Sequence, residues 1–173
     1  MKAIGIVGSP RKNGNTEILT QHTLKAIEEE GLDTVLLRLA GLDIRPCNAC
    51  MVCRGDEERY PIDDDLFPLY TKIKEAEAVI LASPVYFGSA TALLKAFMER
   101  TGYIGLRRRA FTGKVGGPLV VARRAGQNFT LAQITYWFHI LGFYMPGSTY
   151  WNIAFGREKG EVGIAFLVKK LKA

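Results

Sequence analysis

Residues 3–16 read AIGIVGSPRKNGNT and carry the strongest structural signal in the chain. The first part, Ala3–Val7, is apolar and predicts a buried strand, and a helical pattern begins near Glu17. The loop between them, Gly8–Thr16, is built from small and polar residues. A loop of this kind brings backbone N–H groups together at a helix N-terminus, where anions are attracted. The sequence therefore predicts an anion-binding loop.

The composition of this loop favours a phosphate group. Arg11 and Lys12 add full positive charges, and the hydroxyl and amide side chains add hydrogen-bond donors. The loop lacks the Gly-Lys-Ser/Thr ending of triphosphate-binding loops and the three spaced glycines of dinucleotide sites. It therefore points to a single terminal phosphate, as in a flavin mononucleotide. The alternative is an ordinary strand-to-helix turn with Thr16 as the N-cap residue.

The bulk composition sets the class of protein. A chain of 173 residues with 48% hydrophobic and 23% charged residues is typical of one soluble globular domain, residues 1–173. The N-terminus does not resemble a signal peptide, and no apolar run reaches the roughly 18 residues of a membrane span. We therefore expect a cytoplasmic protein with no membrane partner. The net charge of +6 lies in short clusters and not in a continuous stripe, so no nucleic-acid partner is expected.

Strand-like and helix-like segments alternate along the chain. The predicted strands are Ala3–Val7, Thr34–Leu39, Ala78–Ala82, Val115–Ala122 and Phe143–Met145. The predicted helices are Glu17–Glu30, Leu66–Ala76, Thr91–Thr101, Phe129–Leu141 and Glu161–Leu171. Strands separated by helices of this length form a parallel α/β sheet. Because ligands bind at the carboxyl ends of such strands, the loops after the first, third and fourth strands are expected to meet.

Two further loops have the composition of a cofactor site. Ser83–Ser89, SPVYFGS, offers aromatic side chains that can cover a flat ring and a glycine that lets backbone N–H groups approach it. Arg123–Gln127, RRAGQ, can place positive charge beside the same ring. The alternatives are a loop that only begins the next helix and an exposed basic turn. No Ser-His-Asp arrangement or carboxylate pair stands out, so the chemistry is expected to come from a cofactor.

The chain has three cysteines, Cys47, Cys50 and Cys53, in an irregular insertion at residues 40–65. Disulfides at this spacing would be short and strained, and the compartment is expected to be reducing. The pattern C-x-x-C-x-x-C therefore indicates a metal or an iron–sulfur cluster before it indicates a disulfide.

Taken in order, these motifs resemble the NADPH-dependent FMN reductase superfamily, and within it the iron–sulfur flavoproteins of archaea and anaerobic bacteria. The motifs are the loop Ser9–Thr16, the cysteine insertion, the loop Pro84–Gly88 and the turn Arg123–Gln127. The resemblance implies a flavodoxin-like three-layer sandwich with a five-stranded parallel sheet. It also implies non-covalently bound FMN and a homodimer or a dimer of dimers.

The resemblance further implies an FMN-dependent oxidoreductase, either an NAD(P)H-dependent flavin or quinone reductase or an electron-transfer protein of the iron–sulfur flavoprotein kind. The donor would be NAD(P)H or a small redox protein, and the acceptor a quinone, a flavin or oxygen. Two alternatives stay open: a non-catalytic FMN electron carrier, and a metal or redox sensor built on the segment Cys47–Cys53.

The implied site residues fall into two groups. The phosphate would be held by Ser9, Arg11, Asn13, Gly14, Asn15 and Thr16. The isoalloxazine ring would be held by Pro84, Val85, Tyr86, Phe87 and Gly88, with Arg123 and Arg124 beside it. The helices after strands three and four are expected to self-associate through the apolar residues Phe97, Met98, Phe129, Trp137 and Phe138.

The cysteine motif departs from the family pattern at one position. Family members carry a 4Fe–4S cluster on four cysteines, whereas Tyr60 stands here at the fourth position. Three alternatives remain open: a cluster held by three cysteines, a cluster completed by a non-thiolate ligand such as Asp56, and no cluster.

Overall fold

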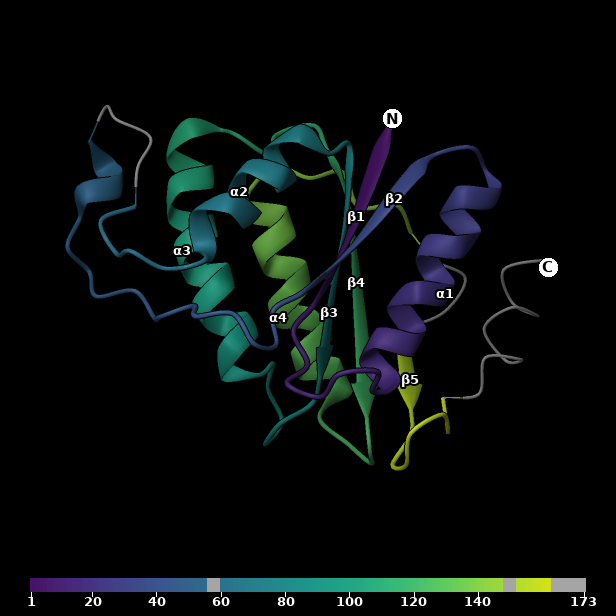
Figure 1. The fold of residues 1–173 in the computed structure, drawn as a ribbon. Coiled ribbons are helices and arrows are strands. Elements are labelled where there is room, and N and C mark those ends of the chain that lie inside the picture. Colours follow the sequence, from purple (N-terminus) through teal and green to yellow (C-terminus); the bar gives the residue numbers. More distant parts are fainter. Residues whose placement is uncertain (56–59, 148–151, 163–173) are drawn as a thin grey trace.

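The computed structural model describes residues 1–55, 60–147 and 152–162 and contains a five-stranded parallel sheet (Figure 1). The strands are β1 (Lys2–Val7), β2 (Asp33–Arg38), β3 (Ala78–Pro84), β4 (Val115–Ala122) and β5 (Ile153–Phe155). Their order across the sheet is β2-β1-β3-β4-β5, and all neighbouring pairs are parallel. This is the strand order of the flavodoxin-like fold, which confirms the expected architecture.

Helices cover both faces of this sheet. The helices are α1 (Asn15–Glu29), α2 (Leu66–Glu75), α3 (Ala92–Arg108) and α4 (Gln127–Ile140), with a short 3-10 helix η1 (Val52–Arg54) in the insertion. Helix α1 lies on one face, and α2, α3 and α4 lie on the other (Figure 1). Within the described part of the chain, no helix is both long enough and apolar enough to cross a bilayer.

Strand β1 is apolar because it is buried in the middle of the sheet. Ile4 and Ile6 are fully buried, and β1 lies between β2 and β3 with helices on both sides of the sheet. A Cβ at Gly5 would lie 2.7 Å from the Thr20 methyl group, so glycine at this position lets α1 pack closely on the strand. The larger core lies under α2, α3 and α4, where aromatic rings such as Phe111 are completely buried.

The last strand lies elsewhere than the sequence predicted. Residues Phe143–Met145 do not form it: Tyr144 makes a single bridge to the start of β4, and Pro146 then removes a backbone donor. The fifth strand is Ile153–Phe155, which pairs with the end of β4. The predicted closing helix Glu161–Leu171 lies outside the described residues from position 163 onward.

Helix α3 is longer than predicted and changes two expectations. It continues to Arg108, beyond the predicted end at Thr101, and Arg107 and Arg108 lie in its last turn. Four of the five apolar residues expected at a subunit interface are buried inside the chain: Phe97, Met98, Trp137 and Phe138. The Trp137 indole N–H donates to the Met98 carbonyl (2.8 Å), which shows that α3 and α4 pack on each other.

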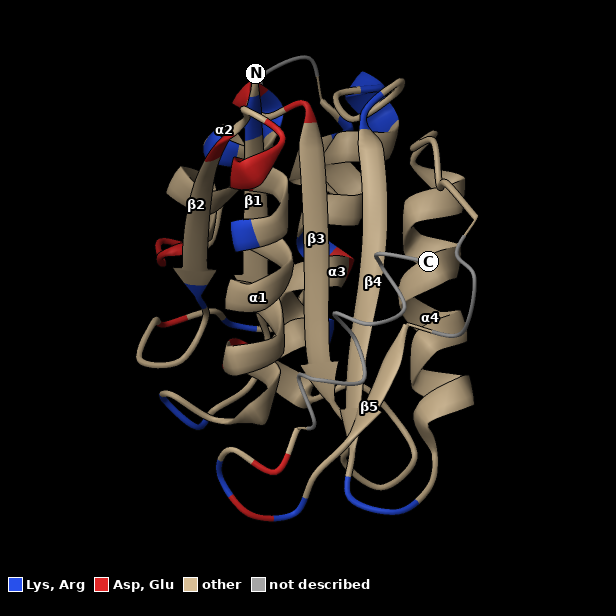
Figure 2. Cartoon of the chain, turned by 90° about the vertical axis from the view of Figure 1, so that its right-hand side faces the viewer, with Lys and Arg blue, Asp and Glu red and all other residues tan. Residues whose placement is uncertain are grey.

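Helix α4 nevertheless keeps an exposed apolar side. Phe129 and Ile140 are each 63% exposed, and Tyr136 is 71% exposed. The helix contains no Lys, Arg, Asp or Glu, so it is uncharged along its length (Figure 2).

The insertion is held to α3 by a buried ion pair. The Arg100 guanidinium donates to the Asp64 carboxylate, and both side chains are almost fully buried. Arg100 also donates to the Arg45 carbonyl (3.1 Å), and the Asp64 carboxylate accepts the backbone N–H groups of Arg45 (3.0 Å) and Leu66 (3.2 Å). Burial works to raise the pKa of Asp64, but these hydrogen bonds outweigh it and the pKa is lowered.

Removing the carboxylate of this ion pair should destabilise the fold strongly. We expect Asp64→Ala to lower the free energy of unfolding by about 3–5 kcal/mol, because Arg100 is then left buried without its counter-ion. Urea unfolding at neutral pH measures the change. The exposed neighbour Asp63 is the matched control, and Asp63→Ala should change stability by less than about 0.5 kcal/mol. Equal stability of the two variants would show that the ion pair does not hold the insertion.

Candidate functional site

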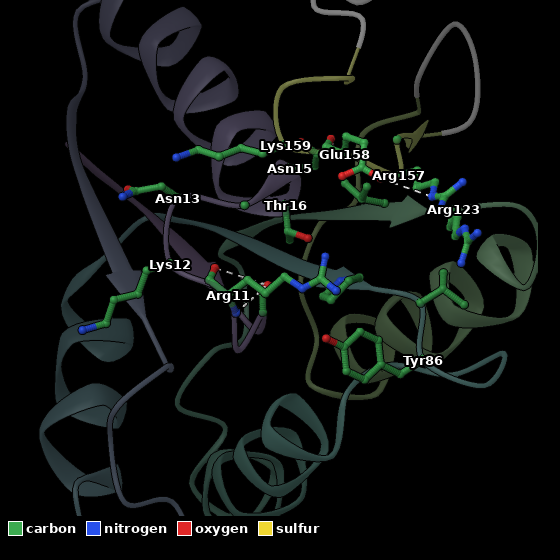
Figure 3. Close-up of a pocket in the computed structure, with 16 residues that line it drawn as sticks. Arg11, Lys12, Asn13, Asn15, Thr16, Tyr86, Arg123, Arg157, Glu158 and Lys159 are labelled. Atoms are coloured by element: carbon green, nitrogen blue, oxygen red, sulfur yellow. Dashed lines mark hydrogen bonds and ion pairs between the residues drawn. The ribbon is translucent and has the colours of Figure 1, made fainter.

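A pocket of about 440 Å³ lies at the carboxyl edge of the sheet, where the loops after β1, β3, β4 and β5 meet (Figure 3). It brings together most of the residues that the sequence assigned to a cofactor: Ser9, Arg11, Asn13, Gly14, Asn15, Thr16, Pro84, Val85, Tyr86 and Arg123. Phe87, Gly88 and Arg124 do not line it. Sequence reasoning missed the residues that follow β5, Gly156–Lys159, which form one side of the pocket.

The phosphate loop, residues 9–16, has the donors that an anion needs. The Arg11 backbone N–H donates to the Ser9 hydroxyl (3.2 Å), which closes a tight turn. Thr16 is buried at the start of α1, and the backbone N–H groups of Asn15, Thr16 and Glu17 have no protein acceptor among the described residues. The Arg11 guanidinium lies across the pocket, whereas the side chains of Lys12 and Asn13 point away from it (Figure 3). The donors at the start of α1 therefore suit a phosphate.

A buried carboxylate fixes the shape of this loop. Glu17 accepts the backbone N–H of Asn13 (2.8 Å) and a hydrogen bond from the Arg38 guanidinium (2.7 Å). Asn13 adopts a left-handed conformation with φ of 54°, which this bond stabilises. The Arg38 hydrogen bond is the main cause of the lowered pKa of Glu17, and burial opposes it. The local sequence signal for the Asn13 contact is a glutamate at the third helical position, which here reaches one residue beyond the N-cap Gly14.

Asn15 joins the phosphate loop to the β5 loop, residues 156–160. Its amide nitrogen donates to the Glu158 carbonyl (2.7 Å), and its amide oxygen accepts the Gly160 N–H (2.7 Å). Both polar atoms of the side chain therefore contact the β5 loop, and the backbone N–H of Asn15 remains for an anion. A Cβ at Gly156 would lie 2.6 Å from the Asn15 amide nitrogen, so glycine is needed for this close approach.

The ring loop, Pro84–Ser89, forms a tight turn at the other side of the pocket. Tyr86 and Ser89 exchange two backbone hydrogen bonds (2.9 and 3.0 Å), and Phe87 adopts a left-handed conformation with φ of 50° and a fully exposed side chain. A Cβ at Gly126 would lie 2.8 Å from the Gly88 Cα. The turn after β4 therefore contacts the ring loop directly, as the parallel sheet predicted.

The three cysteines are not arranged as a metal site. Cys47 and Cys50 are exposed, and Cys53 is half-buried. In the described residues, no three Cys, His, Asp or Glu side chains form a group that fits a metal ion. Burial is the main cause of the raised pKa of the Cys53 thiol, and the other two cysteines add to it. As arranged, the thiols do not fit a cluster.

Tyr60, the residue that the family resemblance aligns with a fourth cysteine, makes aromatic contacts. Its ring meets Phe67 and Tyr70 edge-on at centroid distances of 5.7 and 5.8 Å, and the Arg100 guanidinium lies 5.2 Å from its centroid. Its hydroxyl donates to the Arg100 carbonyl (3.3 Å). The alternative ligand Asp56 lies outside the described residues.

The Glu17 carboxylate should make stability depend on pH. Because its pKa is lowered by folding, its contribution is present above the unfolded pKa and is lost as the pH falls through the folded pKa. We expect Glu17→Gln to cost about 1.5–3 kcal/mol at neutral pH, as for hydrogen bonds to charged groups. In urea unfolding this cost should shrink in acid. The exposed Glu29 is the control: if Glu29→Gln shows the same cost and the same pH dependence, Glu17 has no special role.

Comparison with known proteins shows the family to which the chain belongs. The family model described as NADPH-dependent FMN reductase matches residues 1–158. An iron–sulfur flavoprotein of Methanocaldococcus jannaschii is 41% identical over 170 residues, covering 93% of this chain and 86% of that protein. An iron–sulfur flavoprotein of Methanosarcina thermophila is 35% identical and covers 99% of this chain and 93% of its own.

Solved structures show the same fold. RosB with bound 8-demethyl-8-formylriboflavin-5′-phosphate superposes with a TM-score of 0.73 at 19% identity, covering 94% of this chain and 67% of that one. At this identity the likeness concerns the fold alone. Because the family model covers most of the chain and the 41% identical relative extends over nearly all of it, the chain belongs to the NADPH-dependent FMN reductase family.

Proposed function

We propose that this protein is an FMN-dependent oxidoreductase that takes electrons from a reduced nicotinamide dinucleotide and passes them to a flavin or quinone acceptor. Membership of the FMN reductase family supports the reaction class. The observation that carries the proposal is the pocket itself. Backbone N–H groups at the start of α1, which have no acceptor among the described residues, and the Arg11 guanidinium lie opposite the loop that carries Tyr86.

The residues of the pocket fit FMN in two parts. Ser9, Arg11 and Thr16, with the backbone of Gly14 and Asn15, would hold the phosphate. FMN, when bound, supplies a ring that accepts and donates electrons. The ring loop, with Pro84, Val85 and Tyr86 in the pocket and Phe87 and Gly88 forming its turn, would cover one face of the ring. The turn that begins with Arg123 and Arg124 would place positive charge near the ring, which favours added negative charge there.

Steady-state turnover tests the reaction. Protein loaded with FMN should oxidise NADPH or NADH continuously when a quinone or free flavin is present. The decrease in the absorbance of the reduced nucleotide measures this reaction. A non-catalytic electron carrier would instead bind FMN and be reduced chemically, but it would oxidise neither nucleotide. That result would contradict the proposed enzyme activity and favour a non-catalytic electron carrier.

FMN affinity tests the role of the phosphate loop. We expect Arg11→Ala to weaken FMN binding by about 1.5–3 kcal/mol, because a charge-assisted bond to the phosphate is lost. Quenching of flavin fluorescence measures the dissociation constant. Lys12→Ala is the control, since this side chain points away from the pocket, and its effect should be smaller (Figure 3). Riboflavin lacks the phosphate and should bind more weakly than FMN. Equal affinities for riboflavin and FMN would show that the phosphate loop does not bind the phosphate.

An iron–sulfur cluster is a second candidate redox centre, favoured by the C-x-x-C-x-x-C spacing and opposed by the arrangement of the thiols. We expect air-purified protein to contain FMN and far less iron than a 4Fe–4S cluster holds, because a cluster with three thiolates has an iron open to loss. Tyr60→Cys should raise iron content after anaerobic reconstitution, measured by a colorimetric iron assay. Tyr60→Phe keeps the ring contacts without a thiol and should not. A full cluster in the unmodified protein would show that another group completes the site.

Self-association and location complete the proposal. The exposed side chains of Phe129, Tyr136 and Ile140 on α4 support a homodimer or a dimer of dimers. The other expected interface residues are buried inside the chain and cannot contribute: Phe97, Met98, Trp137 and Phe138. The three free thiols support a reducing compartment, the cytoplasm.

A further inference from the structure

Two arginines, Arg123 and Arg157, lie at the end of the pocket away from the start of α1 (Figure 3). Arg123 follows β4 directly, and Arg157 follows β5 by one further residue. Ala122 and Phe155 are partners in the sheet, and the Gly156 N–H donates to the Ala122 carbonyl (3.0 Å). The two arginines therefore leave neighbouring strands at the same edge of the sheet and line the same pocket.

The backbone that carries Arg157 is fixed on both sides. The Glu161 carboxylate accepts the backbone N–H groups of Arg157 (2.6 Å) and Glu158 (2.8 Å). The Asn15 amide holds Glu158 and Gly160 from the side of the phosphate loop. The long side chain of Arg157 thus extends from a loop whose position is set by four hydrogen bonds.

The guanidinium itself is only weakly engaged. Its Nε lies 3.2 Å from a carboxylate oxygen of Glu158, but the two side chains are 64% and 71% exposed. Exposed pairs of this kind contribute little free energy, so an incoming anion can displace the carboxylate. Lys159, on the same loop, points in the opposite direction (Figure 3). Its charge adds a small contribution to the lowered pKa of Glu17, after the hydrogen bond from Arg38.

Two arginines of the pocket lie away from the place expected for the FMN phosphate. Among the described residues, the charged side chains that face the pocket are Arg11, Arg123, Arg157 and Glu158, whereas Lys12 and Lys159 border it with side chains that point away (Figure 3). FMN brings a single phosphate dianion, which belongs at the start of α1. A nicotinamide dinucleotide brings a pyrophosphate, and NADPH brings a 2′-phosphate in addition. The planar guanidinium group binds phosphate oxygens in pairs, which suits it to this task.

We propose that Arg157, together with Arg123, forms a second phosphate subsite that binds the nicotinamide dinucleotide donor, separately from the phosphate of FMN. When the donor is absent, the Glu158 carboxylate forms an ion pair with the Arg157 guanidinium. The inference rests on the proposed function, because that function supplies the dinucleotide.

Calorimetric titration of the FMN-loaded protein with NADP⁺ and NAD⁺ tests the subsite without turnover. We expect Arg157→Gln to weaken NADP⁺ binding about tenfold or more, as for one charge-assisted contact. Lys159→Gln removes the same charge from the same loop and should change it less than about twofold. Glu158→Gln frees the guanidinium and should tighten binding. A loss with NADP⁺ alone assigns the 2′-phosphate, and an equal loss with NAD⁺ assigns the pyrophosphate.

Three results would overturn the subsite. The first is equal weakening by Arg157→Gln and Lys159→Gln, which would reduce the effect to general electrostatics. The second is a matching loss of FMN affinity in Arg157→Gln, which would place the residue in the cofactor site. The third is an unmodified protein that binds neither nucleotide. A protein that binds NADP⁺ through Arg157 but never oxidises NADPH keeps the subsite and refutes the proposed function, so the two failures are distinguishable.

Discussion

The site depends on one hydrogen bond that joins the end of β1 to the start of α3. The Thr91 hydroxyl donates to the Gly8 carbonyl (2.6 Å) and accepts the Leu94 N–H (3.1 Å), which makes it the N-cap of α3. A Cβ at Gly8 would lie 2.7 Å from the Leu94 Cβ, so only glycine allows this approach. The Gly8 N–H donates to Ala82 of β3 (2.8 Å). The phosphate loop and the ring loop therefore keep a fixed spacing.

Local patterns in the sequence predicted the fold well, because a parallel sheet buries both faces of its strands. The apolar runs of β1, β3 and β4 and the loop compositions placed the phosphate loop, the ring loop and the Arg123 turn at one edge, as observed. Glu17 and the β5 loop were missed for a physical reason. Their roles come from partners distant in sequence: Arg38 for the first, and Asn15 for the second. Composition alone carries no record of such contacts.

Hydrophobicity alone also failed to separate core from interface. Trp137 and Phe138 read as an excess apolar surface, yet α3 and α4 bury them against Phe111 and each other. The insertion, residues 40–65, is a second case in which the most conspicuous residues are not the ones that hold the structure. Its three cysteines are its most conspicuous residues, but the described contacts that hold it include the buried pair of Asp64 and Arg100 and the cation–π contact of Arg100 with Tyr60. Anchoring of this loop thus depends on side chains that no cysteine motif reveals.

The Asn15 contacts have a consequence for the order of events during synthesis. The bonds to Glu158 and Gly160 join residues 143 and 145 positions apart in the chain. Since a nascent chain emerges from its N-terminus, β1 and the phosphate loop leave the ribosome long before the β5 loop exists. One wall of the pocket is therefore missing until the β5 loop has been translated. Tight capture of the cofactor must follow that step, and it marks a chain in which β5 has already joined the sheet.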